Sequence, residues 1–540
     1  MKKLICLLFI AHYSLQIAEA QHPTEEWVAR YTGPSNDLYG PFLQVDKSGN
    51  SYVAGTHVIN DSINILCVKY STSGVQQWAT LYKYPGEAYF GPSGLAIDSS
   101  GNAYVISECG PNSLPPWSGL IVKFNSVTGA PVWAKKYVGQ YGSSRFEVIK
   151  IDRLNNIYVA GTSDSSHLVI RYTTGGDSVW VRKYHPPACG EYSKALIIDD
   201  SLNIIFTGKR RHFYFPGSYD SLLVVKYSPG GVMRWESTYG YSIFVNEGTK
   251  ITADQNGNLY IGGVTTVSSD GVYLTLKYDR NGVQQWAKIY DAPGSGDNTL
   301  RSIAIDRMNN ALFVTGGAVT NGVQMATTIK YNILTGDSIW VKRDTGTFSR
   351  ANNSTICVDS SGYCYTTGGT YNLGLSPFDI MNRKYSDLGN SIWSITYNGP
   401  FNGIDYGIDL ALDNLRNIYV LGTSQSGFQL SDYVIIKYDQ LTGINPVSNT
   451  IPLSFDLEQN YPNPFNPETV IKYDLPKDVK INIRIFDYLG REVAALVSNV
   501  FAKAGSYEIN WNATEFASGV YIYRIEAGEY FCTKKMVLLK

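Results

Sequence analysis

The side chains that could do chemistry are scattered through this sequence of 540 residues and do not fall at catalytic spacings. The HExxH, GxSxG and phosphate-loop patterns are missing, and no cofactor-binding glycine fingerprint follows a strand. Each histidine beyond the first twenty residues stands alone, and we interpret these as loop residues rather than general bases: His22, His57, His167, His185 and His212. The pattern does not favour an enzyme.

Six cysteines follow residue 20, with no CxxC pair and no zinc-ligand spacing. Cys357 and Cys364 flank the turn 359–362, so they could form a disulfide across one hairpin, or stay as two buried thiols. No cofactor and no catalytic metal site are predicted. A calcium ion that stabilises the fold is an open alternative, which thermal stability in chelator would test.

Two irregular segments could bind a ligand. Lys209, Arg210 and Arg211 precede the aromatic run His212–Phe215, and a basic loop of this kind could hold an acidic glycan or a phosphate. The alternative is a solvated loop that covers a neighbouring element. Trp117 ends a second inserted segment, 108–117, and could be a stacking platform for sugar.

These candidates interrupt a unit that recurs eight times. It runs as an apolar strand ending in Asp, a Gly-Asn turn, a strand with Tyr, a strand ending in Lys-Tyr, and a Gly turn before Trp. The 41 Tyr, 51 Gly and 17% charged residues suit many short strands joined by tight turns. The markers are Asp46, Asp98, Asp152, Asp199, Asp254, Asp306, Asp359 and Asp413, and Trp27, Trp78, Trp133, Trp180, Trp235, Trp286, Trp340 and Trp393.

The two series of markers are out of phase. Trp27 precedes the first Asp, whereas the last copy reads Ile444-Asn445-Pro446 where its Trp should be. A ring of blades closes when an N-terminal strand completes the last blade. The sequence therefore predicts an all-β fold with an eight-bladed propeller over residues 22–445, closed by the strand 26–31. We expect the repeated Trp to pack between blades and the repeated Asp to form turns rather than a ring of carboxylates.

In these residues the chain resembles the SBBP-type secreted beta-propeller repeat proteins of bacteria, which are often described as seven-bladed. The resemblance rests on Asp-x-x-Gly-Asn-x-Tyr-Val-x-Gly, Lys-Tyr and Gly-x-x-x-Trp. The turns 128–133 and 335–340 also resemble the tryptophan-docking turns of eight-bladed quinoprotein dehydrogenases. Those enzymes carry adjacent cysteines, and no two cysteines are consecutive here.

A linker at 446–459 leads to a proline-dense entry and several short alternating strands, which predict an immunoglobulin-like sandwich over 460–540. This segment resembles the C-terminal sorting domains of the type IX secretion system. The features that match are Tyr461-Pro462-Asn463-Pro464-Phe465, the runs 487–491, 505–507 and 518–521, and the ending 534–540. The resemblance implies translocation across the outer membrane and the type IX machinery as a partner.

The N-terminus has the order of a cleavable signal peptide at 1–20: Lys2 and Lys3, an apolar run, then Ala18-Glu19-Ala20. No other stretch is apolar enough to span a bilayer, so we expect no transmembrane segment. A net charge of −1 argues against nucleic acid.

We expect a monomeric secreted or cell-surface binding scaffold, with a surface polysaccharide or protein as partner. The alternative is an exported carbohydrate-active or other hydrolase or lyase with its site at the channel mouth.

Overall fold

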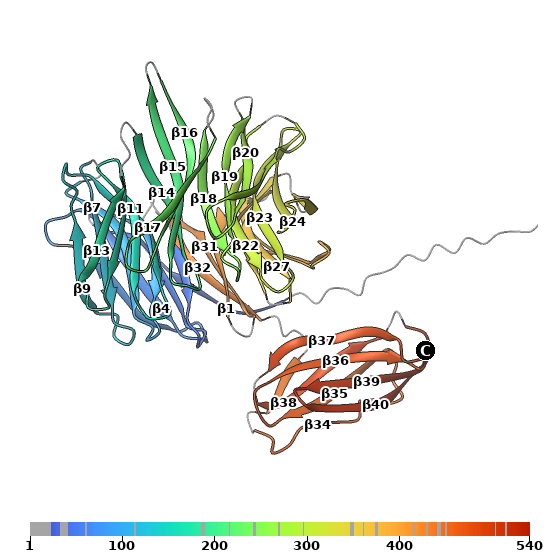
Figure 1. The fold of residues 1–540 in the computed structure, drawn as a ribbon. Helices are drawn as coiled ribbons and strands as arrows, with labels where there is room; N and C mark the ends of the chain where they lie inside the picture. The colour runs from blue at the N-terminus through green and yellow to red at the C-terminus, as the bar shows by residue number, and fades with distance from the viewer. Residues whose placement is uncertain are drawn as a thin grey trace, which may run out of the picture. The chain divides into compact units, whose positions relative to one another are not determined.

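The computed structural model describes residues 23–540, except 33–40, 60–61, 113–114, 185–188, 215–216, 241–244, 268–269, 295, 346–349, 360, 373–375, 414–415, 428–429, 440–443, 449–450, 503 and 514–515. The signal-peptide segment therefore lies outside the described residues. All regular elements in the described part are strands (Figure 1). Contacts divide the chain into the units Thr24–Gln440 and Leu441–Lys540.

The first unit consists of eight four-stranded antiparallel sheets, which confirms the predicted blades. Blade one contains β2 (Phe42–Val45), β3 (Ser51–Ile59), β4 (Ser62–Tyr70) and β5 (Gln76–Tyr82), and blade two contains β6 (Tyr89–Ile97), β7 (Ala103–Gly110), β8 (Ser118–Phe124) and β9 (Pro131–Tyr137). Blade three contains β10 (Ser144–Ile151), β11 (Ile157–Ser163), β12 (Ser166–Tyr172) and β13 (Ser178–Tyr184). Blade four contains β14 (Cys189–Ile198), β15 (Ile204–Tyr214), β16 (Gly217–Tyr227) and β17 (Met233–Tyr239).

Blade five contains β18 (Asn246–Ala253), β19 (Leu259–Val267), β20 (Asp270–Tyr278) and β21 (Gln284–Tyr290). Blade six contains β22 (Thr299–Asp306), β23 (Ala311–Thr320), β24 (Val323–Asn332) and β25 (Ser338–Asp344). Blade seven contains β26 (Arg350–Val358), β27 (Cys364–Asn372), β28 (Ser376–Tyr385) and β29 (Ser391–Tyr397). Blade eight contains β30 (Asp405–Leu412), β31 (Ile418–Gly427), β32 (Leu430–Asp439) and the N-terminal β1 (Thr24–Tyr31).

The ring closes as the phase of the markers predicts. β1 pairs antiparallel with β32, with Trp27 opposite Lys437. The innermost strand of each blade contacts that of the next, and β30 returns to β2. A ladder of backbone hydrogen bonds therefore joins the two ends of the propeller.

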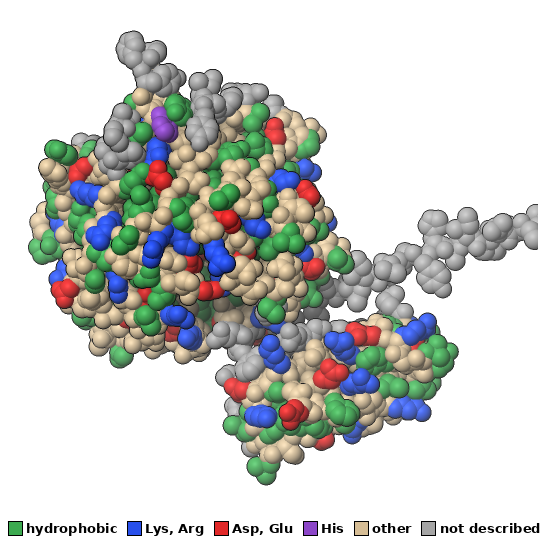
Figure 2. All heavy atoms as spheres, in the orientation of Figure 1, with side chains coloured by type: hydrophobic (Ala, Val, Ile, Leu, Met, Phe, Trp, Pro, Cys, Tyr) green, Lys and Arg blue, Asp and Glu red, His purple; other side chains and the backbone are tan. Residues whose placement is uncertain are grey.

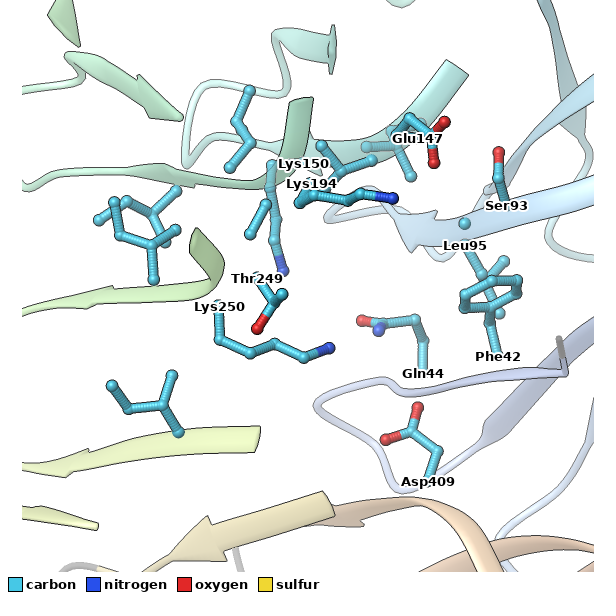
Figure 3. A pocket seen from close by; sticks show the side chains of 18 residues that line it. Phe42, Gln44, Ser93, Leu95, Glu147, Lys150, Lys194, Thr249, Lys250 and Asp409 are labelled. Atoms are coloured by element: carbon cyan, nitrogen blue, oxygen red, sulfur yellow. The ribbon is translucent and has the colours of Figure 1, made fainter. Parts of the chain in front are cut away.

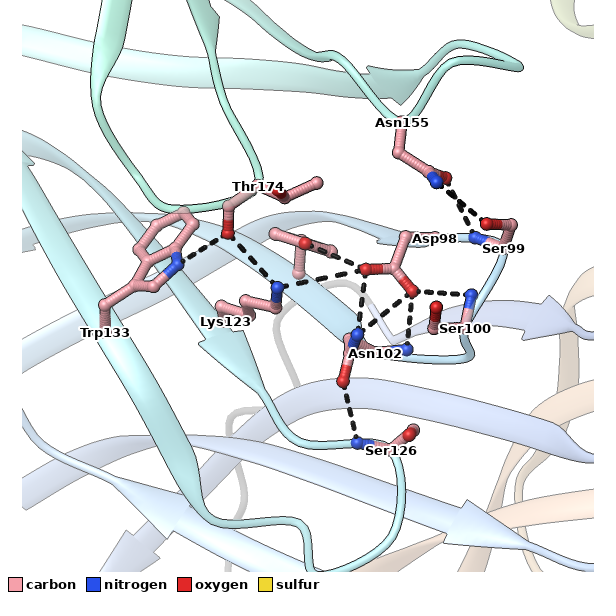
Figure 4. A network of polar contacts seen from close by, with 10 residues as sticks. Asp98, Ser99, Ser100, Asn102, Lys123, Ser126, Trp133, Asn155 and Thr174 are labelled. Atoms are coloured by element: carbon pink, nitrogen blue, oxygen red, sulfur yellow. Dashed lines mark hydrogen bonds and ion pairs between the residues drawn. The ribbon is translucent and has the colours of Figure 1, made fainter.

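Each repeated Asp forms a turn at one end of its blade. Oδ1 of Asp98 accepts hydrogen bonds from the backbone N–H of Ser100 at 3.0 Å and of Asn102 at 2.9 Å, and Oδ2 accepts one from Tyr104 OH (Figure 4). Equivalent bonds form at the other copies, for example Asp46 and Asp254. The prediction that these carboxylates form turns is confirmed.

The repeated Trp bonds each blade to its neighbour. In Figure 4 the indole N–H of Trp133 and the ammonium of Lys123 donate to the same carbonyl, that of Thr174 in blade three, at 3.0 and 3.1 Å. Within the described residues, seven of the repeated Trp side chains donate to a turn carbonyl of the next blade in this way. Because the indoles pack between blades, the prediction of a structural role is confirmed.

The cysteine pair does not form a disulfide. The described cysteines are all free, Cys357 and Cys364 among them. Cys357 pairs with Tyr365 across the hairpin, whereas Cys364 pairs with Val358. Neighbouring residues of a strand point to opposite faces, so the two thiols lie on opposite sides of the blade.

The second unit is a sandwich of two antiparallel sheets around one apolar core. One sheet has the order β33-β38-β35-β34 and the other β37-β36-β39-β40. The strands are β33 (Ile444–Ser448), β34 (Asp456–Leu457), β35 (Glu468–Leu475), β36 (Val479–Asp487), β37 (Glu492–Ala502), β38 (Gly505–Asn512), β39 (Gly519–Ala527) and β40 (Tyr530–Leu538).

Three of these strands were not predicted from the sequence. β37 has no apolar–polar alternation to reveal it, and β34 has only two residues. β33 crosses the boundary drawn at 445 and enters the predicted linker, yet it pairs with β38. This pairing places residues 444–448 in the sandwich rather than between the units.

Candidate functional site

A cavity in the channel of the propeller gathers charged side chains from several innermost strands (Figure 3). It has a volume of about 340 Å³. Apolar side chains such as Leu95 and Ile303 form part of the wall. The polar side chains that line it are Gln44, Ser93, Glu147, Lys150, Lys194, Thr249, Lys250 and Asp409.

A recurring β-bulge helps to position these side chains. In seven blades the register of the innermost strand shifts at the same place relative to the repeated Asp. A bulge adds one residue to the strand and re-aims its side chain. The bulged residues that line the cavity are Ser93, Glu147, Lys194 and Thr249.

Lys150 and Lys250 present ammonium groups to this cavity. Figure 3 shows both side chains extending into it, from β10 and β18. Both side chains are open to water in the channel, although protein surrounds them closely enough for burial to lower the pKa of each. Among the described residues neither ammonium has a hydrogen bond or an ion pair within 4.0 Å. They differ in this from Lys194, which lies 3.9 Å from Glu247.

Asp409 supplies a carboxylate on another side of the cavity. Its Oδ1 accepts the N–H of Leu410 at 2.9 Å, and its Oδ2 accepts the N–H of Leu43 in blade one at 3.3 Å. Burial raises the pKa of Asp409, and those two hydrogen bonds and the charges of Lys250 and Lys150 act against the rise. The carboxylate therefore joins blade eight to blade one while it faces the lysines across the cavity.

Glu147 is the second carboxylate of the cavity wall. Burial raises its pKa, and the positive charges of Lys194 and Arg145 lower it. The cavity as a whole offers ammonium donors and carboxylate and amide acceptors from separate blades. Such a site can bind a small molecule with an anionic group and hydrogen-bonding groups beside it.

The basic segment 209–211 is part of a strand, not the loop predicted from the sequence. β15 continues through it and pairs with β16. Arg210 donates to Glu191 at 2.6 Å and to Glu236 at 3.1 Å, and Arg211 donates to Asp220 at 2.8 Å. Nζ of Lys209 lies 3.3 Å from the same Asp220.

The charges of this segment are therefore matched by carboxylates of neighbouring strands, which the sequence pattern could not show. A ligand-binding role for the segment stays a prediction. Phe215 lies outside the described residues.

Trp117 is half-buried, and Arg145 covers it. The guanidinium carbon of Arg145 lies 3.8 Å from the centre of a ring of Trp117, and Nε of Arg145 lies 3.1 Å from Glu108. A sugar would have to use the other face of the indole. The stacking role of Trp117 stays a prediction.

The described histidines contradict the expectation that they lie in loops. His57, His167 and His212 lie in β3, β12 and β15 rather than in loops. His22 and His185 lie outside the described residues. His212 contacts the thiol of Cys189, its direct cross-strand neighbour, at 3.6 Å. None of the three lines the channel cavity.

Within the described part of the chain, no three His, Cys, Asp or Glu side chains lie together as a metal site would require. Among the same residues, no helix has the length and apolar character needed to cross a membrane.

Comparison with known families identifies the C-terminal segment. Residues 459–539 match the family described as the secretion system C-terminal sorting domain. The second unit therefore carries a type IX sorting domain, and the protein is secreted to the cell surface or the extracellular space. None of the curated proteins compared with the chain matches it.

Several solved structures are similar to the chain. PorZ, a surface component of the type IX secretion system of Porphyromonas gingivalis, has 12% identity and a TM-score of 0.38, over 93% of this chain and 75% of that one. Sqt1 of Chaetomium thermophilum has 9% identity and a TM-score of 0.47, over 78% and 99%. A fungal alcohol oxidase in complex with copper has 9% identity and a TM-score of 0.42, over 96% and 100%.

Proposed function

We propose that this protein is an exported binding protein. Its sorting domain delivers it through the type IX machinery, and its propeller binds a partner through the channel. The observation that carries the proposal is the pair of ammonium groups of Lys150 and Lys250, which face the cavity without a counter-charge in contact among the described residues.

The contrast with the rest of the ring supports this assignment. The repeated Asp, Lys and Trp side chains hydrogen-bond within and between blades, as Asp98, Lys123 and Trp133 do. Those groups build the scaffold. The ammonium groups of Lys150 and Lys250 take no part in that pattern. An anionic group of a bound partner could form charge-assisted hydrogen bonds with both of them.

Delivery is tested by removing the sorting domain. A variant that lacks residues 459–540 should accumulate inside the cell, whereas the full chain should be found at the surface or in the medium. Equal amounts of both proteins outside the cell would contradict the proposed route.

Binding is tested with the full chain and an extract of cell-surface material from the host. The extract should raise the melting temperature of the protein in a saturable way. An unchanged melting temperature across the whole concentration range would contradict a binding function. Conversion of a component of the extract by the protein would instead identify an enzyme.

A further inference from the structure

The channel cavity offers two kinds of charge on different sides. Lys150 belongs to blade three, Lys250 to blade five and Asp409 to blade eight. Figure 3 shows the two ammonium groups and the carboxylate directed into one space, with Gln44 above Asp409 and beside the tip of Lys250 in this view. Side chains from three blades thus surround a single space.

These groups do not neutralise one another by contact. The carboxylate of Asp409 accepts two backbone N–H groups, and neither lysine lies within 4.0 Å of it among the described residues. The charges still act across the cavity, because Asp409 favours the charged form of both lysines and Lys250 disfavours that of Lys150. An anionic group between the two ammonium groups would relieve their repulsion and gain charge-assisted hydrogen bonds.

The size of the cavity limits what can enter. A volume of about 340 Å³ lies near the lower end of the range of small-molecule sites, about 300–1,000 Å³. This space suits a single sugar-sized molecule rather than a folded partner. The apolar wall around Leu95 and Ile303 gives the carbon skeleton of such a molecule a surface to contact.

The hydrogen-bond acceptors in the cavity wall further restrict the chemical class of the ligand. Sulfate, which carries no proton near neutral pH, could use the lysines but has no donor for the carboxylate of Asp409 or the amide oxygen of Gln44. A hydroxylated molecule could donate to both. Nε2 of Gln44 already donates to the carbonyl of Leu43 at 2.8 Å, which fixes the amide and leaves its oxygen as an acceptor.

We propose that the cavity binds a small sugar acid, with its carboxylate between Lys150 and Lys250 and its hydroxyl groups on Gln44 and Asp409. The inference rests on the proposed binding function and names the class of ligand for that same site.

The test is calorimetric titration of the full chain with glucuronate, glucose and sulfate. Glucuronate should bind saturably at one site per chain, and more tightly than sulfate. Glucose should bind at least ten-fold more weakly than glucuronate, because a lost hydrogen bond to a charged group weakens binding by about that factor or more.

Variants assign the site. Lys150→Met and Lys250→Met should each weaken glucuronate binding ten-fold or more, while Lys288→Met, on the exterior strand β21, should leave it unchanged. Gln44→Leu removes an acceptor for the hydroxyl groups and keeps both lysines, so it should weaken the binding of glucuronate but not that of sulfate. Melting temperatures equal to that of the wild type would show that the variants are folded.

Three results would overturn the inference: no binding of glucuronate, sulfate binding as tight as glucuronate binding, or glucuronate binding that both lysine variants retain. If cell-surface extract still stabilises the protein in those cases, the proposed binding function is retained and only the proposed ligand class or its site is wrong.

Discussion

The indole N–H of Trp78 donates a hydrogen bond to the backbone carbonyl of Ser126 at 3.3 Å, which binds the outer strand of blade one to a turn of blade two. Gly129 ends that turn and lies directly against the indole, because a Cβ placed on it would come 2.5 Å from Cδ2 of Trp78. The same contact recurs around the ring, for example between Gly74 and Trp27. The repeat therefore requires the turn glycine and the tryptophan of the preceding blade together.

Gly129→Ala should destabilise the propeller more than Gly86→Ala. Both glycines have positive φ, 69° and 85°, but a Cβ on Gly86 meets no atom within 4 Å. Each substitution carries a backbone strain of roughly 1–2 kcal/mol, and only Gly129→Ala adds a collision, worth about 1–3 kcal/mol. Urea unfolding of both variants measures the difference. Equal losses of stability would show that the indole does not constrain this position.

Arg210→Met should be strongly destabilising. The side chain of Glu191 is completely buried, and Arg210 donates to it at 2.6 Å. Loss of one partner of a buried pair costs about 3–5 kcal/mol, because the carboxyl group of Glu191 would stay buried without its partner. Lys288→Met, which breaks the exposed pair with Asp337, is the control and should change stability little. Thermal unfolding compares them, and similar melting temperatures would contradict the account of β15.

His167 should make the propeller sensitive to acid. The imidazole is buried, stacks on Phe206 with ring centres 3.2 Å apart and contacts the hydroxyl of Ser193. Burial lowers its pKa well below 6.5. Because the folded state keeps the ring neutral while the unfolded chain binds a proton, this contribution to stability is complete above about pH 6.5 and declines as the pH falls below it.

The decline amounts to about 1.4 kcal/mol per pH unit while the folded imidazole stays neutral. The variant His167→Gln should therefore lose less stability than the wild type between pH 7.5 and pH 5.5, as measured by urea unfolding at both values. Identical losses would mean that the imidazole is protonated in the folded protein.

Cys357 and Cys364 should both react as free thiols once the protein is unfolded. Burial raises the pKa of Cys357 to about 12 and raises the pKa of Cys364 well above its ordinary value, so both should be inert in the native state. Alkylation in denaturant followed by peptide mass spectrometry measures the thiols. A linked peptide pair that disappears on reduction would contradict the register of β26 and β27.

The sequence predicted the ring because its markers repeat. Asp98 and Trp133 stand for contacts that every blade makes, so eight copies at regular spacing were enough to predict the blades, the closing strand and the role of the indoles. The sorting domain was predicted for a similar reason, since its motifs are local. β37 was missed because its apolar residues do not alternate with polar ones.

The channel site could not be predicted in the same way, because it consists of positions where the repeats differ. Lys150 lies two residues before its repeated Asp, and Lys250 lies four before its own. A local signal was present only for Lys150, which interrupts the apolar run Val148-Ile149-Lys150-Ile151; the strand of Lys250 is mostly polar and gives no such signal. Conversely, the basic run that contains Arg210 indicated a ligand-binding segment. The carboxylates that pair with Arg210 come from strands that no local sequence pattern connects to it.

The measurement that tests the central claim most directly is a crystal structure of the full chain grown with glucuronate at a saturating concentration. The account predicts the sugar acid in the channel, with its carboxylate within hydrogen-bonding distance of Nζ of both Lys150 and Lys250. Glucuronate bound elsewhere on the propeller, or a channel that holds only water at that concentration, would contradict it.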